Sequence, residues 1–121
     1  MAQKPNGSGL QRLWRASLCS WSGLVKAWRN ESAFRQEVAL VIFGLPCALW
    51  LGNSGVERAL LVGSLLQILL VELLNSSIEA VVDRIGPERH VLSGQAKDLG
   101  SAAVSLTLFI AAVIWLLIVL N

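Results

Sequence analysis

Three long stretches of the chain are almost free of charged residues, and this pattern predicts helices that cross a membrane. Val38–Val56 and Leu99–Asn121 carry no charge, and Ala59–Ile78 carries a single one, at Glu72. A helix needs about 20 mostly apolar residues to cross the hydrocarbon core of a bilayer. We therefore expect one membrane domain over 1–121, with transmembrane helices over about 33–52, 56–84 and 97–119.

The segment before the first span has a different periodicity. Apolar side chains, three of them Trp, recur every three or four positions over residues 10–29, with Arg, Lys and Ser between them. This pattern is typical of an amphipathic helix that lies in the membrane interface, although a core-packing helix of a soluble protein has the same spacing. Three spans follow, so the surface helix is favoured. The predicted fold class is an all-α membrane protein with an N-terminal amphipathic surface helix and three transmembrane helices.

Composition and charge agree with this class and add an orientation. The chain has 121 residues, a hydrophobic fraction of 55% and a net charge of +2, and its mean hydropathy of +0.62 is too high for a soluble domain. We expect no nucleic-acid partner.

All Lys and Arg residues except Arg58 lie before residue 36 or within 84–97, so the positive-inside rule places the N-terminus and the 84–97 loop in the cytoplasm. Cys19 and Cys47 would lie at different depths, which argues against a disulfide between them.

The most unusual feature is a polar stripe on the second apolar helix. Glu72, Asn75, Glu79 and Asp83 fall within about 80° of one another on a helical projection. Acids are costly on a membrane helix and are usually functional there. We therefore interpret this acid stripe as an active site at the membrane surface.

The acid stripe suggests phosphoryl transfer. Glu72 is the deepest acid, about one helical turn inside the inner boundary, and is the candidate general base for a lipid hydroxyl. Neighbouring carboxylates indicate a divalent cation, and oxygen ligands suit Mg²⁺. Glu31, Lys97 and Asp98 are expected at the same membrane face, where Lys97 could contact a phosphate.

Structural roles remain open for several of these residues. Lys97 and Asp98 could be an inner-boundary anchor followed by an acid at a helix start, and Glu31 could be a helix N-terminal acid. Asp83 could belong to a solvated helix end, and His90 could be an ordinary loop residue. No Walker or kinase-type glycine loop is present, so any nucleotide site is of another type.

Two functions from other classes compete with a kinase. A small proton-coupled transporter would place its carboxylate near the bilayer midplane, whereas these acids crowd toward one end of the helix and continue into water. A structural membrane subunit would leave the acid stripe unexplained. The pattern therefore favours a lipid kinase.

Three segments closely resemble the prokaryotic diacylglycerol kinase family: NESAFRQE (30–37), VELLNSSIEAVVDRIG (71–86) and AKDLGSAAV (96–104). The resemblance implies a homotrimer in the bacterial inner membrane, with composite active sites at the cytoplasmic face. It implies transfer of the ATP γ-phosphoryl group to sn-1,2-diacylglycerol, which gives phosphatidic acid in phospholipid recycling. A branch of the same family phosphorylates undecaprenol, and the NESAFRQE segment looks more like the diacylglycerol branch.

The resemblance also implies roles for individual residues. Glu72 becomes the general base, Glu31 and Glu79 become the Mg²⁺ ligands, and Asn75 and Asp83 support the site. The residues implied at the ATP are Arg12, Cys19, Glu31, Glu79, Glu88, Arg89, His90, Lys97 and Asp98. The residues implied at the lipid are Arg12, Trp28, Phe34, Arg35, Gln36, Glu37, Trp50, Arg58, Glu72 and Ser101. Gln95 stands where the family pattern has a basic residue.

Overall fold

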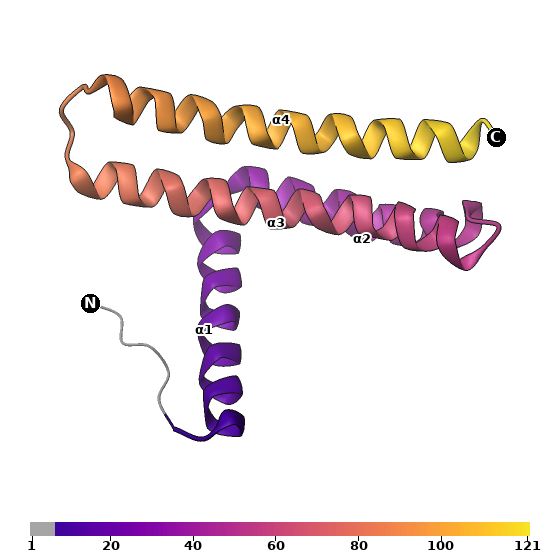
Figure 1. Cartoon of the computed structure of the whole chain (residues 1–121), viewed down its shortest axis with the longest axis horizontal. Helices are drawn as coiled ribbons and strands as arrows, with labels where there is room; N and C mark the ends of the chain where they lie inside the picture. Colours follow the sequence, from indigo (N-terminus) through magenta and orange to yellow (C-terminus); the bar gives the residue numbers. More distant parts are fainter. Residues whose placement is uncertain (1–6) are drawn as a thin grey trace. The chain divides into compact units, whose positions relative to one another are not determined.

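The structure, a computed structural model, describes residues 7–121 and contains four α-helices (Figure 1). The chain divides into two compact units, Met1–Ser32 and Ala33–Asn121, which are described separately. Lys4, one of the cations that the charge distribution assigns to the cytoplasmic side, lies outside the described residues.

Unit 1 contains α1 (Gly9–Asn30), and its first turn is held by a capping box. The Gln11 backbone N–H donates to Ser8 Oγ at 3.5 Å, and the Ser8 backbone N–H donates to Gln11 Oε1 at 3.3 Å. These bonds satisfy donors that every helix N-terminus leaves unpaired. The helix predicted over 10–29 is therefore confirmed to within one residue at each end, and its place on a membrane surface stays a prediction.

Unit 2 contains three helices, α2 (Ser32–Leu51), α3 (Gly55–Ile85) and α4 (Val91–Val119). All three are long and apolar enough to cross a membrane, and they coincide with the three predicted spans. The predicted bounds 33–52 and 56–84 agree with α2 and α3 to within one residue. Between them, Ser54 caps α3 by accepting from the Glu57 backbone N–H at 3.1 Å.

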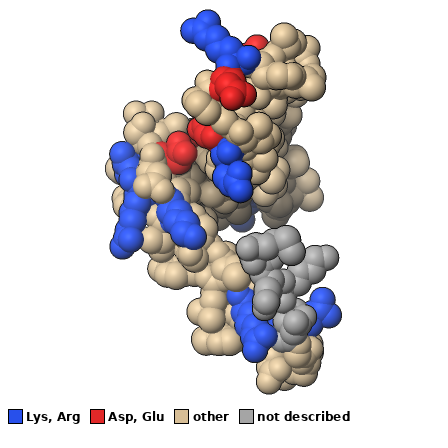
Figure 2. Space-filling model, turned by 90° about the vertical axis from the view of Figure 1, so that its left-hand side faces the viewer, with Lys and Arg blue, Asp and Glu red and all other residues tan. Residues whose placement is uncertain are grey.

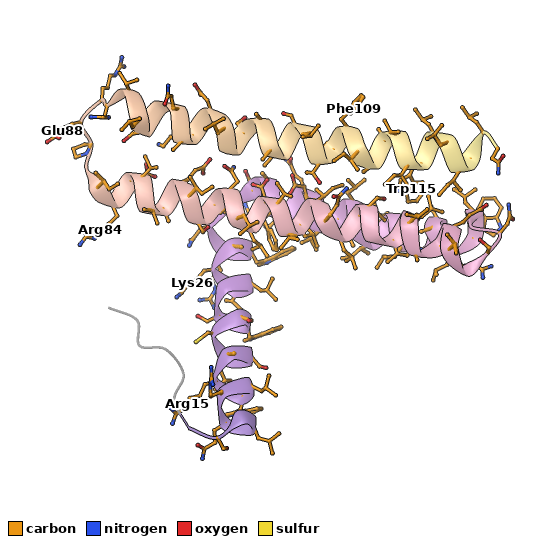
Figure 3. The ribbon with its side chains drawn as sticks, in the orientation of Figure 1. Arg15, Lys26, Arg84, Glu88, Phe109 and Trp115 are labelled. Carbon is orange, nitrogen blue, oxygen red and sulfur yellow. The ribbon has the colours of Figure 1, made fainter. Side chains whose placement is uncertain are left out.

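Helices α3 and α4 lie side by side and antiparallel (Figure 1). Trp115 points from α4 toward α3 (Figure 3), where its Nε1–H donates to Ser64 Oγ at 2.9 Å. Ser64 is 3% exposed, and its hydroxyl in turn donates to the Leu61 carbonyl at 2.7 Å. Polar groups that face hydrocarbon need partners inside the protein, and this chain of hydrogen bonds supplies them.

Helix α2 packs closely on α3 at a glycine. A Cβ atom added to Gly44 would lie 2.7 Å from Leu65 Cδ1, so a larger residue here would force the Leu65 side chain to move. At the α2–α3 turn, Arg58 Nε donates to the Leu49 carbonyl at 3.2 Å. Pro46 lies inside α2, and the helix runs through it from Ser32 to Leu51.

The start of α4 differs from the sequence-based prediction. We expected a polar loop over 88–95 and a helix from 97, but α4 begins at Val91. His90 caps it, because its Nδ1 accepts from the Leu92 backbone N–H at 3.0 Å. Asp98 therefore lies inside α4, and the interpretation of this residue as an acid at a helix start is wrong.

The Trp115–Ser64 hydrogen bond gives a prediction for stability. Trp115→Phe removes the donor, and we expect the free energy of unfolding to fall by about 1 kcal/mol, since hydrogen bonds between membrane helices contribute about 0.6 kcal/mol on average. Thermal unfolding in detergent, followed by helical circular dichroism, measures this change. Trp50→Phe is the matched control, because Trp50 is 82% exposed. Equal stability of the two variants would show that the bond contributes nothing.

Candidate active site

The acid stripe lies along the last turns of α3, on one face, and becomes more exposed toward the end of the helix. Glu72 is 5% exposed and Asn75 is 9% exposed, whereas Glu79 is half-buried. The Asp83 side chain is largely exposed. The predicted gradient, from a buried acid at Glu72 to a solvated one at Asp83, is therefore present in the structure.

Asn75 contacts one of the acids of the stripe. Its Nδ2 donates to Glu79 Oε1 at 3.3 Å, which orients the Glu79 carboxylate. Its Oδ1 is buried and has no hydrogen-bond partner among residues 7–121. Gly100 of α4 lies directly against this oxygen, because a Cβ atom added there would clash with it. Gly100 was not among the candidate site residues of the sequence analysis.

The outer end of the stripe is tied to α4 by an ion pair. Lys97 Nζ lies 2.8 Å from Asp83 Oδ1, and both side chains are substantially exposed. Figure 2 shows basic and acidic side chains together at the end of unit 2 that carries the α3–α4 loop. An exposed pair of this kind contributes little to stability, so Lys97 can exchange Asp83 for a phosphate at small cost.

Helix α2 contributes a carboxyl group next to the deepest acid. The Glu37 carboxyl lies within hydrogen-bonding reach of the Glu72 carboxyl. Glu37 Oε2 is buried and has no hydrogen-bond partner in the described part of the chain. Sequence reasoning gave Glu37 only a lipid contact and missed this pairing. The available signal was its position as the last charged residue before the apolar run of α2.

The site residues expected in the loop and on α4 lie near the same end of unit 2. Glu88 and Arg89 are exposed in the α3–α4 loop, and Figure 3 shows Glu88 at its outer edge. His90, the last residue of this loop, caps α4 as described above. Ser101 follows Gly100 and is exposed, whereas Gln95 lies in the first turns of α4.

The residues implied at the lipid fall into two groups in unit 2. Phe34, Arg35 and Gln36 lie in the first turns of α2, near Glu37, and Phe34 is buried. Trp50 and Arg58 lie at the α2–α3 turn. Fourteen residues of continuous helix separate Arg58 from Glu72, which is about 21 Å. The structure therefore does not bring Trp50 or Arg58 to the acid stripe, and any lipid contact they make is at the opposite end of α3.

Four of the expected site residues belong to unit 1 and its end. Arg12, Cys19 and Trp28 lie on α1, and Glu31 is the single residue between α1 and α2. The Glu31 backbone N–H donates to the Ala27 carbonyl at 2.9 Å. Their roles at ATP, Mg²⁺ and lipid stay predictions.

The donor set suits Mg²⁺ better than a metal that needs a closed ligand cage. Within residues 7–121, no group of three or more His, Cys, Asp or Glu side chains converges on one point. Mg²⁺ is commonly held by one or two carboxylates together with substrate phosphates. Glu79, oriented by Asn75, and the unpartnered Asn75 Oδ1 are oxygen groups of the required kind. The residues present therefore fit this ion.

Comparison with known proteins shows the family to which this chain belongs. The sequence profile of the family described as prokaryotic diacylglycerol kinase matches residues 18–119. This chain belongs to that family. The diacylglycerol kinase of Escherichia coli strain K12 is 49% identical over 110 residues, which cover 91% of this chain and 90% of the relative. The diacylglycerol kinase of Pseudomonas aeruginosa is 48% identical over 114 residues, or 94% and 93% of the two chains.

The diacylglycerol kinase of Haemophilus influenzae is 45% identical over 108 residues, which cover 89% of this chain and 92% of the relative. The coverage shows that likeness to these diacylglycerol kinases extends over the described helices rather than over one motif. The predicted membership in the prokaryotic diacylglycerol kinase family, and with it the prediction of an enzyme of that class, is confirmed.

Proposed function

We propose that this member of the diacylglycerol kinase family transfers the γ-phosphoryl group of ATP to sn-1,2-diacylglycerol and forms phosphatidic acid in phospholipid recycling. The observation that carries the proposal is the family match over residues 18–119. The relatives compared above share the name diacylglycerol kinase, which favours this lipid over undecaprenol. The acids lie at one end of α3 rather than at its centre, which supports a kinase over a proton-coupled transporter.

Glu72 acts as the general base in this proposal. It is the most buried acid of the stripe, and its expected depth, about one helical turn inside the inner boundary, is that of a lipid hydroxyl group. Glu72 accepts the hydroxyl proton as the lipid oxygen forms its bond to the γ-phosphorus and ADP leaves. The Glu37 carboxyl lies beside Glu72 and can share a hydrogen bond with it once Glu72 has taken up the proton.

The nucleotide binds at the outer end of the stripe. Glu79, together with Glu31, would hold Mg²⁺, which when bound neutralises charge on the β- and γ-phosphates. Lys97 is the candidate cation for a phosphate, and Asp98 lies beside it in α4. Because His90 Nδ1 accepts a hydrogen bond, the neutral ring carries its hydrogen on Nε2, where it can be donated to the nucleotide. Arg12, Cys19, Glu88 and Arg89 complete the proposed ATP contacts.

Assembly and location follow from the same chemistry. Membership in the family supports a homotrimer with sites shared between neighbouring copies. The distribution of Lys and Arg supports an inner-membrane protein whose α3–α4 loop and active site face the cytoplasm. Helix α1 then lies on the cytoplasmic membrane surface with its Trp side chains toward the lipid.

A lipid-substrate panel with Mg²⁺ and ATP tests the reaction. We expect phosphatidic acid to form from diacylglycerol, little product from undecaprenol, and loss of activity when EDTA removes Mg²⁺. Thin-layer chromatography with γ-labelled ATP measures the products. Preference for undecaprenol would assign the chain to the undecaprenol kinase branch of the family. Absence of ATP consumption with every lipid alcohol would favour a proton-coupled transporter instead. Activity that persists in EDTA would contradict the proposal that the reaction requires Mg²⁺.

A further inference from the structure

Thr107 carries a buried hydroxyl group that the reaction described above does not use. Its side chain is 3% exposed, and its Oγ1 has no hydrogen-bond partner within residues 7–121. Hydroxyl groups inside helices commonly donate to a carbonyl of the preceding turn, as those of Ser17, Ser20, Ser64 and Ser77 do in this chain. Thr107 makes no such bond. A buried polar group without a partner costs free energy, so this hydroxyl calls for a physical reason.

The buried side of α4 faces α3. The three buried residues of α4 are Gly100, Thr107 and Ala111, and they fall within about 40° of one another on a helical projection. Gly100 lies directly against Asn75 of α3, as described above. Thr107 therefore faces the side of α3 that carries Asn75 and the other buried member of the acid stripe, Glu72.

The antiparallel packing of α3 and α4 (Figure 1) brings Thr107 close to Glu72. Thr107 is seven residues after Gly100 in α4. Because Gly100 lies against Asn75, the residue of α3 at the level of Thr107 is seven positions earlier, at Ile68. Glu72 is one helical turn further along α3 than Ile68, or about 6 Å.

The directions of the two side chains shorten this distance. Side chains lean toward the N-terminus of their own helix, so in an antiparallel pair Thr107 leans toward the level of Glu72, and Glu72 leans toward the level of Thr107. The separation that remains is within reach of one bridging water molecule. Glu37 approaches Glu72 from α2, so Thr107 adds a polar group from a different helix.

A hydroxyl group suits a residue that must hold a proton acceptor in place. Its O–H donates to an ionised carboxylate, and its oxygen accepts from the same group after the proton has been taken up. The rate of proton transfer depends on the distance and direction from the base to the proton that it removes. A hydrogen bond from α4 would restrict the rotation of the Glu72 side chain and so fix that direction.

We propose that Thr107 is a positioning residue for Glu72: its hydroxyl donates, through one bridging water molecule, to the Glu72 carboxylate and holds it toward the lipid hydroxyl. The proposal rests on the proposed role of Glu72 as general base. It adds a residue of α4 that acts through Glu72 and has no assigned contact with lipid or nucleotide.

Thr107→Val tests this role, because it replaces the hydroxyl by a methyl group of nearly the same shape. We expect kcat with diacylglycerol to fall about ten-fold, the effect of losing one hydrogen bond to a charged group, with KM for both substrates unchanged. Thr107→Ser keeps the hydroxyl and should recover most of the rate. Ser105→Ala is the matched control, because it removes an exposed hydroxyl from the same part of α4.

Three kinetic results would overturn the proposal. These are full activity of Thr107→Val, a change in KM alone, and an equal loss of kcat in Thr107→Val and Thr107→Ser. The last result would show that Thr107 acts through packing rather than through its hydroxyl.

Infrared spectroscopy gives a readout that does not need the reaction. Hydrogen bonding changes the stretching frequency of a carboxyl group, so the band that Glu72→Gln removes should shift in Thr107→Val and stay in place in Thr107→Ser and Ser105→Ala. An unchanged band in Thr107→Val would reject the contact, even if the unchanged chain is an active kinase. A shifted band in a protein that forms no phosphatidic acid would support the contact and reject the proposed function.

Discussion

Replacing Glu72 by Gln will lower the rate of phosphoryl transfer to diacylglycerol by about 10²–10⁴-fold, the usual contribution of a positioned general base. Glu72 is the most buried acid of the stripe, at 5% exposed, and it lies beside the Glu37 carboxyl. The amide has nearly the same shape as the carboxyl, but it cannot accept the proton of the lipid hydroxyl. A steady-state assay with saturating Mg²⁺ and ATP measures the loss.

The fold should survive this change. A neutral amide is easier to bury than a carboxylate, and it can still hydrogen-bond to Glu37. We therefore expect an unchanged helix content and an unchanged oligomer. Glu57→Gln is the control, because Glu57 lies at the opposite end of α3 and caps only the α2–α3 turn. Full activity of the Glu72→Gln variant would remove Glu72 from the role of base.

Gly100→Ala should lower kcat/KM for Mg²⁺-ATP by about 10–100-fold, the range found when a group that orients a metal ligand is disturbed. The added methyl group would clash with Asn75 Oδ1. The amide must then move, and its Nδ2 releases Glu79 Oε1. Because Glu79 is a proposed Mg²⁺ ligand, the variant should also need more Mg²⁺ for half-maximal activity. Titration of Mg²⁺ at fixed ATP measures this requirement.

Two further variants show whether this effect acts through Asn75. Gly55→Ala adds a methyl group to a helical glycine whose Cβ atom would meet nothing within 4 Å, so we expect normal activity. In an Asn75→Ala background the clash disappears. There, Gly100→Ala should lower kcat/KM for Mg²⁺-ATP much less than it does in the unchanged chain. If Gly100→Ala is fully active, or if its cost is the same in both backgrounds, Gly100 does not position Asn75.

The helices were predictable because each depends on a local pattern. The apolar runs of α2 and α3 exceed the length that a bilayer needs, and the predicted bounds differ from the observed ones by one residue. The start of α4 was missed, because the cap on His90 depends on the rotation of one side chain, which composition does not reveal. The segment 91–95 contains Ser and Gly, and these residues favoured a loop.

The acid stripe was predictable for the same reason as the helices. Glu72, Asn75, Glu79 and Asp83 lie on one helix, so a period of 3.6 residues is enough to bring them to one face. Gly100 shows the limit of this reasoning, since its contact with Asn75 Oδ1 depends on how α4 lies against α3.

The sequence by itself determined the three spans, the face that carries the acids and the family. Only the tertiary structure decided which groups meet across helices: Glu37 with Glu72, Gly100 with Asn75, and Lys97 with Asp83. A helical period relates residues of one helix to one another. Contacts between helices depend on the rotation and the axial register of two helices, and those are set by the close packing of side chains from distant parts of the chain.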